Sequence, residues 1–497
     1  MSREETPEAV TVDNSRVAGL GQVAGRAVRW VALEKWVTRF IGLGVFVVLG
    51  RLLVPTDFGV VAIASTIVTL LVLLSDQGFS GALVQRFELD RQHLSTCFWA
   101  GIALSLVFLS GLWLSAPAIA AAYGAPGLTS VIRALSFVIP LQALAGVPSA
   151  ILQRTFNFKS LALRRISGTV AGSVGAVAAA AAGWGVWSLV VQAVGTSLVS
   201  LIVLWSVGDW RPDFAFSLAA LRDIWSVGWH IVSIELVGYA NSQADKFIIG
   251  AVAGAEALGY YFVGERIVAM IMDIQTSVVA QIALSTFSRL QQEKSKALQV
   301  FYKMTAASAS ISLPVYVVAA CVAPYLIPSL FGPQWPQSIV IMQILCLMGA
   351  LNSIIYFDRN FLVALGASSK ALVLTAGQAL LGVVVIVVAA RFGIIAVAIS
   401  MVLRQYAFWP IRLFILKRAT GLSLRPYFGS LWRCVTCAAI ALGVGWSVVL
   451  MLRGADLGNW PRTLILTVTI FGVYGGILFL INRTFLAEMV RLVRGRS

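Results

Sequence analysis

The chain has 497 residues, of which 59% are hydrophobic and 12% are charged, and its mean hydropathy is +0.89. Soluble domains carry roughly 25% charged residues, so this composition excludes a soluble globular fold for most of the chain. The formal net charge of +16 is interpreted as the Lys and Arg excess of cytoplasmic membrane-protein loops, and not as a nucleic-acid-binding surface.

Hydrophobic runs predict about fourteen transmembrane helices, since roughly 20 mostly apolar residues cross a bilayer. In chain order the predicted spans are 30–53, 57–80, 95–122, 128–152, 160–182, 185–206, 222–250, 257–287, 301–328, 338–364, 369–390, 393–416, 430–452 and 462–482. Clusters of Pro, Gly and polar residues separate the spans, as in YGAPG at 123–127. The sequence therefore predicts an all-α polytopic membrane protein.

The distribution of basic residues predicts how these helices are oriented in the membrane. If the N-terminus lies inside, most Lys and Arg of the loops and span edges fall on the inner side, including Arg154, Lys159, Arg164 and Arg165. The outer side receives Arg51, Arg391, Arg453 and Arg462. This asymmetry predicts a multi-pass protein of the inner (plasma) membrane with both termini in the cytoplasm.

The sequence also contains an internal repeat. LGRLLVPTDFGVV (49–61) resembles IGAVAGAEALGYY (249–261), so that Gly50 and Gly59 match Gly250 and Gly259, and GWGVWSLVV (183–191) resembles RFGIIAVAI (391–399). We predict a six-helix lobe at 1–206, a cytoplasmic linker at 207–221, a second six-helix lobe at 222–418 and an additional helix pair at 427–483. Two such parallel halves create a central cavity that opens to either side of the membrane.

Charged residues are concentrated in the equivalent spans of the two halves. A charged side chain at the bilayer centre costs about 2.5–3.5 kcal/mol, so these residues are expected to face a wet cavity, to pair, or to reach a span end. Lys35 and Arg39 are four residues apart and share one helix face, which predicts an anionic ligand. Spans one, two, seven and eight contain Glu34, Lys35, Arg39, Asp76, Glu235, Asp245, Lys246, Glu265, Arg266 and Asp273.

From this set the candidates for substrate binding in the cavity are Lys35, Arg39, Glu235, Arg266 and Asp273. The candidates for a gate or for ion coupling are Asp76, Asp245, Lys246 and Glu265. A structural alternative stays open for the latter group, in which Asp245–Lys246 and Glu265–Arg266 are ion pairs that brace the helices. No catalytic residue and no metal site is expected, and the Cys434–Cys437 pair is interpreted as small apolar packing residues of a membrane helix.

Several segments are similar to one known family. RLLVPTDFGVVAIASTIVTLLVLLSDQGFSGALVQR (51–86), GWGVWSLVVQ (183–192), QADKFIIG (243–250), ALGYYFVGERI (257–267) and SLFGPQW (329–335) resemble Wzx-type polysaccharide flippases, the polysaccharide-transporter branch of the MOP superfamily that also contains the MATE exporters and the lipid II flippase MurJ. The resemblance runs from about residue 25 to residue 420 and is closest to exporters of exopolysaccharide units.

The resemblance implies two pseudo-symmetric six-helix lobes, the MOP flippase fold, followed by two further helices. It implies that the protein is not an enzyme and moves undecaprenyl-pyrophosphate-linked oligosaccharide from the cytoplasmic to the periplasmic leaflet by alternating access. A gradient of H⁺ or Na⁺ is the implied driving force, with no other cofactor. Membrane lipids and the lipid-linked glycan are the implied partners, together with a polysaccharide polymerase and export machinery.

Three other functions stay open at this point. An ion-coupled multidrug exporter of the MATE type would have the same architecture, but its cavity is expected to be acidic or aromatic. A membrane polysaccharide polymerase or glycosyltransferase is less favoured, because the predicted outer loops are short and no Asp-x-Asp metal site is present. A membrane scaffold would not need so many charged residues within its spans.

Overall fold

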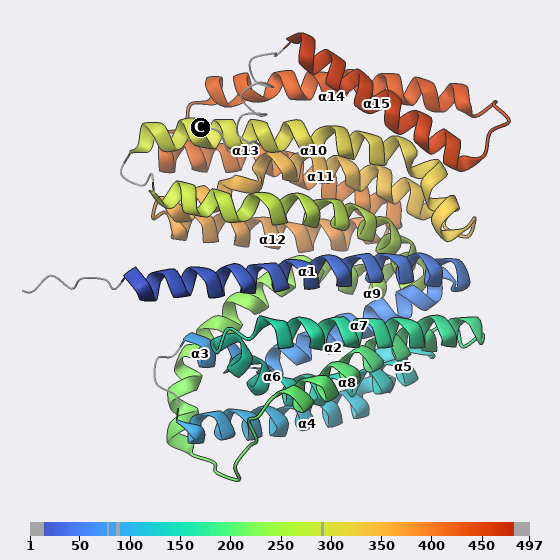
Figure 1. The fold of residues 1–497 in the computed structure, drawn as a ribbon. Helices are drawn as coiled ribbons and strands as arrows, with labels where there is room; N and C mark the ends of the chain where they lie inside the picture. The colour runs from blue at the N-terminus through green and yellow to red at the C-terminus, as the bar shows by residue number, and fades with distance from the viewer. Residues whose placement is uncertain (1–13, 77–78, 86–89, 290–292, 482–497) are drawn as a thin grey trace, which may run out of the picture. The chain divides into compact units, whose positions relative to one another are not determined.

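The computed structural model describes residues 14–76, 79–85, 90–289 and 293–481, and the regular structure in these ranges is α-helical (Figure 1). The helices are α1 (Asn14–Leu52), α2 (Pro55–Asp76), α3 (Phe79–Gln85), α4 (Arg91–Ala122), α5 (Leu128–Ser136), α6 (Val138–Arg154), α7 (Phe158–Ala181), α8 (Trp187–Val207), α9 (Leu218–Arg289), α10 (Lys294–Phe331), α11 (Pro336–Ala364), α12 (Ser368–Ala390), α13 (Ile394–Thr420), α14 (Leu424–Leu452) and α15 (Asn459–Ile481). The prediction of an all-α polytopic membrane protein is confirmed.

Eleven helical segments of the described ranges are long and apolar enough to cross a membrane. The eleven do not include α1, α7 and the first part of α9, which the sequence also predicts to be spans and which are helical here. The terminal segments 1–13 and 482–497 lie outside the described residues, and the cytoplasmic placement of both ends stays a prediction.

One predicted boundary has a clear structural basis, and another differs from the structure. Gly254 has non-helical backbone angles (φ 85°, ψ 173°) inside α9 and separates the predicted spans seven and eight. Glycine adopts this positive φ without the steric cost that a side chain would add. Predicted span two extends to residue 80, whereas α2 ends at Asp76 and residues Phe79–Gln85 form the separate short helix α3.

Contacts divide the chain into two compact units. The first contains residues 1–52, 64–119 and 126–240, and the second contains 53–63, 120–125 and 241–497. Residues 218–240 of α9 therefore group with the N-terminal helices. The start of α2 groups with the C-terminal helices.

In the first unit α7 packs against both α1 and α8. Gly168 and Gly172 form a GxxxG spacing on α7, and a Cβ atom at either position would stand 2.6 Å from Thr196 O or 2.7 Å from Gln192 O of α8. Small residues at this spacing let two membrane helices approach closely. The α7–α8 pair is therefore a rigid support for the residues that α7 contributes to the site.

In the second unit α10 lies against α11, α14 and α15, and α14 and α15 run side by side (Figure 1). Phe301 of α10 stacks with Phe361 at 4.6 Å between ring centroids. On α14, Cys434 and Cys437 are buried in the same core and are free thiols. The last two helices are thus packed parts of this unit through α10.

Candidate functional site

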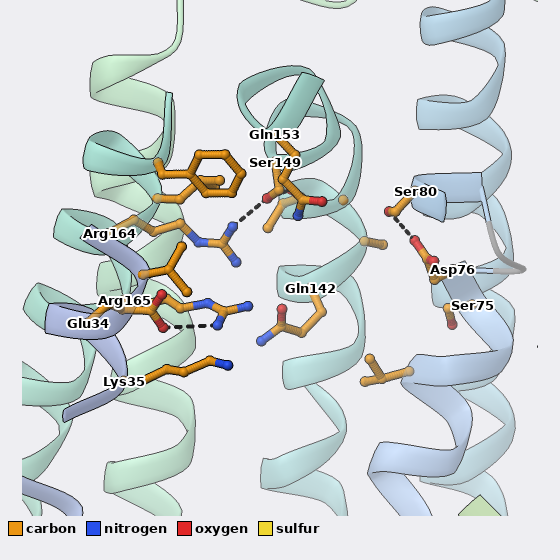
Figure 2. Close-up of a pocket in the computed structure, with 17 residues that line it drawn as sticks. Glu34, Lys35, Ser75, Asp76, Ser80, Gln142, Ser149, Gln153, Arg164 and Arg165 are labelled. Atoms are coloured by element: carbon orange, nitrogen blue, oxygen red, sulfur yellow. Dashed lines mark hydrogen bonds and ion pairs between the residues drawn. The ribbon is translucent and has the colours of Figure 1, made fainter. Parts of the chain in front are cut away.

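A cavity of about 370 Å³ lies within the first unit (Figure 2). Five helices contribute to its lining, namely α1, α2, α3, α6 and α7. The lining residues are Val31, Glu34, Lys35, Val72, Ser75, Asp76, Ser80, Gln142, Ala143, Ala145, Gly146, Ser149, Gln153, Phe158, Leu161, Arg164 and Arg165. More than half of these side chains are polar or charged, which is unusual for the interior of membrane-spanning helices.

Basic residues from α1 and α7 make one side of the cavity (Figure 2). Arg165 donates to Glu34 Oε1 at 3.0 Å, which ties α7 to α1. Arg164 donates to the hydroxyl of Ser149 on α6, while its Nε is buried and has no hydrogen-bond partner among the described residues. No carboxylate of the described residues lies within ion-pair distance of Lys35 or Arg164. These two cations are therefore available to an anion in the cavity.

The other side of the cavity contains hydroxyl and amide groups and one acid (Figure 2). Ser80 of α3 donates a hydrogen bond to Asp76 Oδ1 at the end of α2. Gly146 of α6 lies against this pair, since a Cβ atom there would stand 3.2 Å from Ser80 Oγ and 3.4 Å from Asp76 Oδ1. Ser75 Oγ is buried and has no hydrogen-bond partner in the described part of the chain. This side therefore offers hydrogen-bonding groups to a polar, uncharged ligand part.

The charges of the lining residues do not cancel. Lys35, Arg164 and Arg165 are basic, whereas Glu34 and Asp76 are acidic. Glu34 is engaged by Arg165, and Asp76 lies beside Ser80 on the side opposite the basic residues. A ligand with an anionic part and a hydroxyl-rich part matches this separation of charge, because Arg and Lys bind phosphate and carboxylate groups strongly.

The structure places two of the predicted site residues, Lys35 and Asp76, on this cavity. Arg39 is not among its lining residues, and its guanidinium lies 5.9 Å from the ring centroid of Trp36 on the same helix. Glu235 belongs to the same unit and is exposed. The roles predicted for these residues stay predictions.

The remaining predicted residues belong to the second unit. Lys246 pairs with Glu265 at 3.3 Å, so the ion pair joins the two segments of α9 and not neighbours in the sequence. Asp245 is buried and accepts a hydrogen bond from the Tyr261 hydroxyl at 2.7 Å. Arg266 and Asp273 are exposed. A buried carboxylate joined to a buried phenol is a candidate for binding a proton or a small cation.

Sequence reasoning missed Arg164 and Arg165 as site residues, because it counted them as topology-setting charges near a cytoplasmic loop. Both lie inside α7, two turns after its start at Phe158. Gln142, Ser149 and Gln153 of α6 were missed as well. Their spacing of seven and four residues puts them on one helix face, which is a signal that the sequence contains.

Several known proteins are similar to this chain. A family model described as "Polysaccharide biosynthesis protein" matches residues 48–340. The succinoglycan biosynthesis transport protein ExoT of Rhizobium meliloti (strain 1021) is 28% identical over 322 residues, and the aligned part spans 65% of this chain and 65% of that protein. The teichuronic acid biosynthesis protein TuaB of Bacillus subtilis (strain 168) is 27% identical over 434 residues, covering 84% of this chain and 88% of that protein.

Among solved structures, the lipid II flippase MurJ in an inward closed conformation matches with a TM-score of 0.73. The match covers 92% of this chain and 100% of that chain at 13% sequence identity. At this identity the likeness shows the fold. It confirms the predicted all-α fold of a polytopic membrane protein.

Proposed function

The chain belongs to the family of polysaccharide biosynthesis proteins, and from this premise we propose that it is a flippase for a glycan linked to a lipid pyrophosphate. The substrate class is undecaprenyl-pyrophosphate-linked oligosaccharide for exopolysaccharide or a related surface polysaccharide. Alternating access would carry its polar headgroup from the cytoplasmic to the periplasmic leaflet of the inner membrane. No covalent bond is made or broken in this process.

The observation that carries the proposal is the separation of charge in the cavity of the first unit. Among the described residues no carboxylate forms an ion pair with Lys35 or Arg164, although a charged side chain at the bilayer centre costs about 2.5–3.5 kcal/mol on insertion scales. A pyrophosphate would neutralise both positive charges. The guanidinium of Arg164 can form two parallel hydrogen bonds to it, and the ammonium of Lys35 attracts it as a point charge. Sugar hydroxyls match Ser75, Gln142 and Asp76 on the other side.

The size of the cavity fits the headgroup and not the whole substrate. About 370 Å³ is equivalent to roughly twelve water molecules at about 30 Å³ each. This volume is at the low end for ligand sites, which span about 300–1,000 Å³. We propose that the pyrophosphate and the adjoining sugar occupy it, that the rest of the glycan extends out of it, and that the lipid tail remains in the bilayer.

We further propose that an H⁺ or Na⁺ gradient drives the cycle through the acidic groups of the second unit. Asp245, Tyr261, Lys246 and Glu265 form a buried or half-buried polar cluster on α9. Binding or release of one cation there changes the local charge by one unit, which favours one conformation over the other. A polysaccharide polymerase and the export machinery are the proposed recipients of the translocated glycan.

A multidrug exporter is the alternative with the same fold. Such a protein would export organic cations, which the positive charges of Lys35 and Arg164 in the cavity repel. The family match and the names of the two relatives also favour the glycan. A polymerase would need a catalytic group in its site. Binding of the substrate is sufficient to explain the residues of this cavity, so a polymerase is less favoured.

The test is deletion of the gene in its source organism, followed by analysis of lipid-linked oligosaccharides in spheroplasts and of polymer at the surface. We expect complete lipid-linked units to accumulate on the cytoplasmic side and surface polymer to be lost. Restoration by the wild-type gene is the control. Intact polymer export together with altered resistance to cationic drugs would reject the proposal in favour of the multidrug exporter.

A further inference from the structure

The turn between α6 and α7 contains a strained aromatic residue. Phe156 has φ +55°, and among the described residues it is the one residue other than glycine with a positive φ. The left-handed conformation brings Cβ close to the following carbonyl oxygen, so a bulky residue adopts it only at a cost in free energy. Such strain persists where another requirement fixes the residue, and it is concentrated at functional positions.

The second half of the chain makes the same turn with glycine. Gly366 follows α11 at φ +76°. Three backbone hydrogen bonds agree between the two turns: Thr155 N to Ile151 O (3.0 Å) with Leu365 N to Phe361 O (3.1 Å), Phe156 N to Gln153 O with Gly366 N to Val363 O (both 3.1 Å), and Asn157 N to Leu152 O (2.9 Å) with Ala367 N to Leu362 O (2.8 Å). Glycine is the ordinary residue at this position after a helix. The backbone therefore does not require the phenyl ring of Phe156.

Core packing does not account for Phe156 either. The residue is 54% exposed, so burial of its ring offsets little of the strain. Its ring meets the ring of Phe158 at 6.1 Å in a T-shaped arrangement. Phe158 lines the charged cavity together with Gln153 of α6. The strained ring thus adjoins the end of the cavity where α6 ends and α7 begins.

The geometry of α7 relates this aromatic pair to the basic residues. Phe158 and Arg164 are six residues apart on one helix, which corresponds to about 9 Å along the axis. A pyrophosphate held at Arg164 leaves this distance for sugar between the phosphate and the rings. Gln153 lines the cavity together with Phe158, and its side-chain amide supplies hydrogen-bond donors for sugar hydroxyls.

We propose that Phe156 and Phe158 form a stacking platform for a pyranose ring of the transported glycan, beyond the sugar that adjoins the pyrophosphate. The apolar face of the sugar ring packs on an aromatic face, while its hydroxyls remain available to polar neighbours. The platform accounts for an exposed phenyl ring in a backbone conformation suited to glycine. This inference rests on the proposed function, because it takes the pyrophosphate of the lipid-linked glycan to lie at Arg164.

The test uses purified full-length protein in nanodiscs with two probes, bare undecaprenyl pyrophosphate and undecaprenyl pyrophosphate carrying a linear trisaccharide of hexoses. For the Phe156→Gly variant we expect an unchanged affinity for the bare lipid and an affinity for the glycan-bearing lipid that is lower by about three- to tenfold. Phe156→Trp should retain the affinity for the glycan-bearing lipid. Phe216→Ala is the matched control, since Phe216 is 53% exposed on the segment between α8 and α9.

The melting temperature separates this role from a structural one. Phe156→Gly is expected to melt at or above the wild-type temperature, because glycine relieves the strain of the positive φ. A lower melting temperature with lower membrane abundance would overturn the platform and make Phe156 an anchor of the turn or of the membrane interface. An equal loss of affinity for both probes, or no loss for either, would also overturn it. Failure of the wild-type protein to bind either probe would instead reject the proposed function.

Discussion

Gly259 of α9 lies directly against the backbone carbonyl group of Pro55 at the start of α2. A Cβ atom at Gly259 would overlap the carbonyl oxygen and stand 2.6 Å from the carbonyl carbon. The repeat partner of this contact is present as well, because a Cβ atom at Gly59 would stand 2.5 Å from the carbonyl carbon of Ala255. The two repeats therefore meet through equivalent residues, and in the predicted topology this crossing lies on the outer side of the membrane.

Replacing either glycine by alanine should weaken the crossing. Because the opposing atoms belong to the backbone, Gly259→Ala and Gly59→Ala are expected to destabilise this arrangement by about 1–3 kcal/mol, as overpacking does. Export should fall, and a cysteine introduced at the outer end of α2 should become more reactive to a membrane-impermeant thiol reagent. Gly111→Ala on α4 is the control, since nothing lies within 4 Å of a Cβ there, and it should be neutral or stabilising. Normal export by both crossing variants would contradict the role of this contact.

Arg164 should contribute more to substrate binding than an arginine outside the cavity. Hydrogen bonds to charged groups contribute about 1.5–3 kcal/mol, so Arg164→Ala is expected to weaken binding of undecaprenyl pyrophosphate by about 10- to 100-fold. Arg164→Lys should restore part of the affinity, because lysine keeps the positive charge but cannot form the two parallel hydrogen bonds of a guanidinium. Binding is measured on purified protein, with membrane abundance measured in parallel.

Arg133 supplies the matched control for Arg164, since it lies 5.0 Å from the ring centroid of Trp113 and does not line the cavity. Arg133→Ala should leave the affinity unchanged. Arg39→Ala is expected to lower export without lowering abundance, by less than Arg164→Ala does. If Arg39→Ala lowered export more than Arg164→Ala, the anion-binding site would lie outside the described cavity.

Glu34→Gln should increase the affinity for the anionic headgroup. Glu34 is buried and its partner Arg165 is exposed at the side chain by 60%, so the pair itself contributes about 1 kcal/mol or less to stability. The change removes one negative charge and releases Arg165 for the ligand. We expect tighter binding of undecaprenyl pyrophosphate at low salt and a smaller difference at high salt, where charges are screened. Weaker binding would show that Glu34 is needed to hold Arg165 in position.

Tyr261→Phe should destabilise the second unit. The Tyr261 hydroxyl is a hydrogen-bond donor to the buried Asp245 carboxylate at 2.7 Å, and leaving a buried acceptor unsatisfied costs about 1–3 kcal/mol. A lower melting temperature is expected, with an altered dependence of transport on the ion gradient if Asp245 couples to it. Tyr406→Phe is the control, because the Tyr406 hydroxyl reaches Leu347 O at 3.2 Å from an exposed position. Equal melting temperatures for both variants would contradict the importance of the Asp245 contact.

The sequence was sufficient to predict the helices because each hydrophobic run is bounded by residues that end helices. Span 128–152, for example, corresponds to α5 and α6 taken together, which extend from Leu128 to Arg154. The short helix α3 was not predicted, since the sequence was read as one span over 57–80 and the polar and glycine residues after Asp76 were included in it. Hydropathy predicts the length of a hydrophobic segment but not where one helix ends and the next begins within it.

The site was predicted only in part for a different reason. Lys35 and Asp76 stand out as charges in otherwise apolar spans, so the sequence alone identified them. The pairing of Glu34 with Arg165 depends on the packing of α7 against α1, and no pattern within either helix shows which other helix it contacts. Residues near a predicted loop were therefore assigned to topology although they line the cavity.

The break at Gly254 has a consequence for dividing the protein into fragments. By sequence the second repeat begins near residue 222, whereas by contacts residues 126–240 group with the N-terminal helices. A fragment that ends at residue 206 lacks Ile224, which is 2% exposed in a core made with Phe79 and Phe98. Separately expressed pieces should therefore reassociate into working protein more readily when the chain is cut at Gly254, between the two segments of α9, than when it is cut where the ancestral copies were joined.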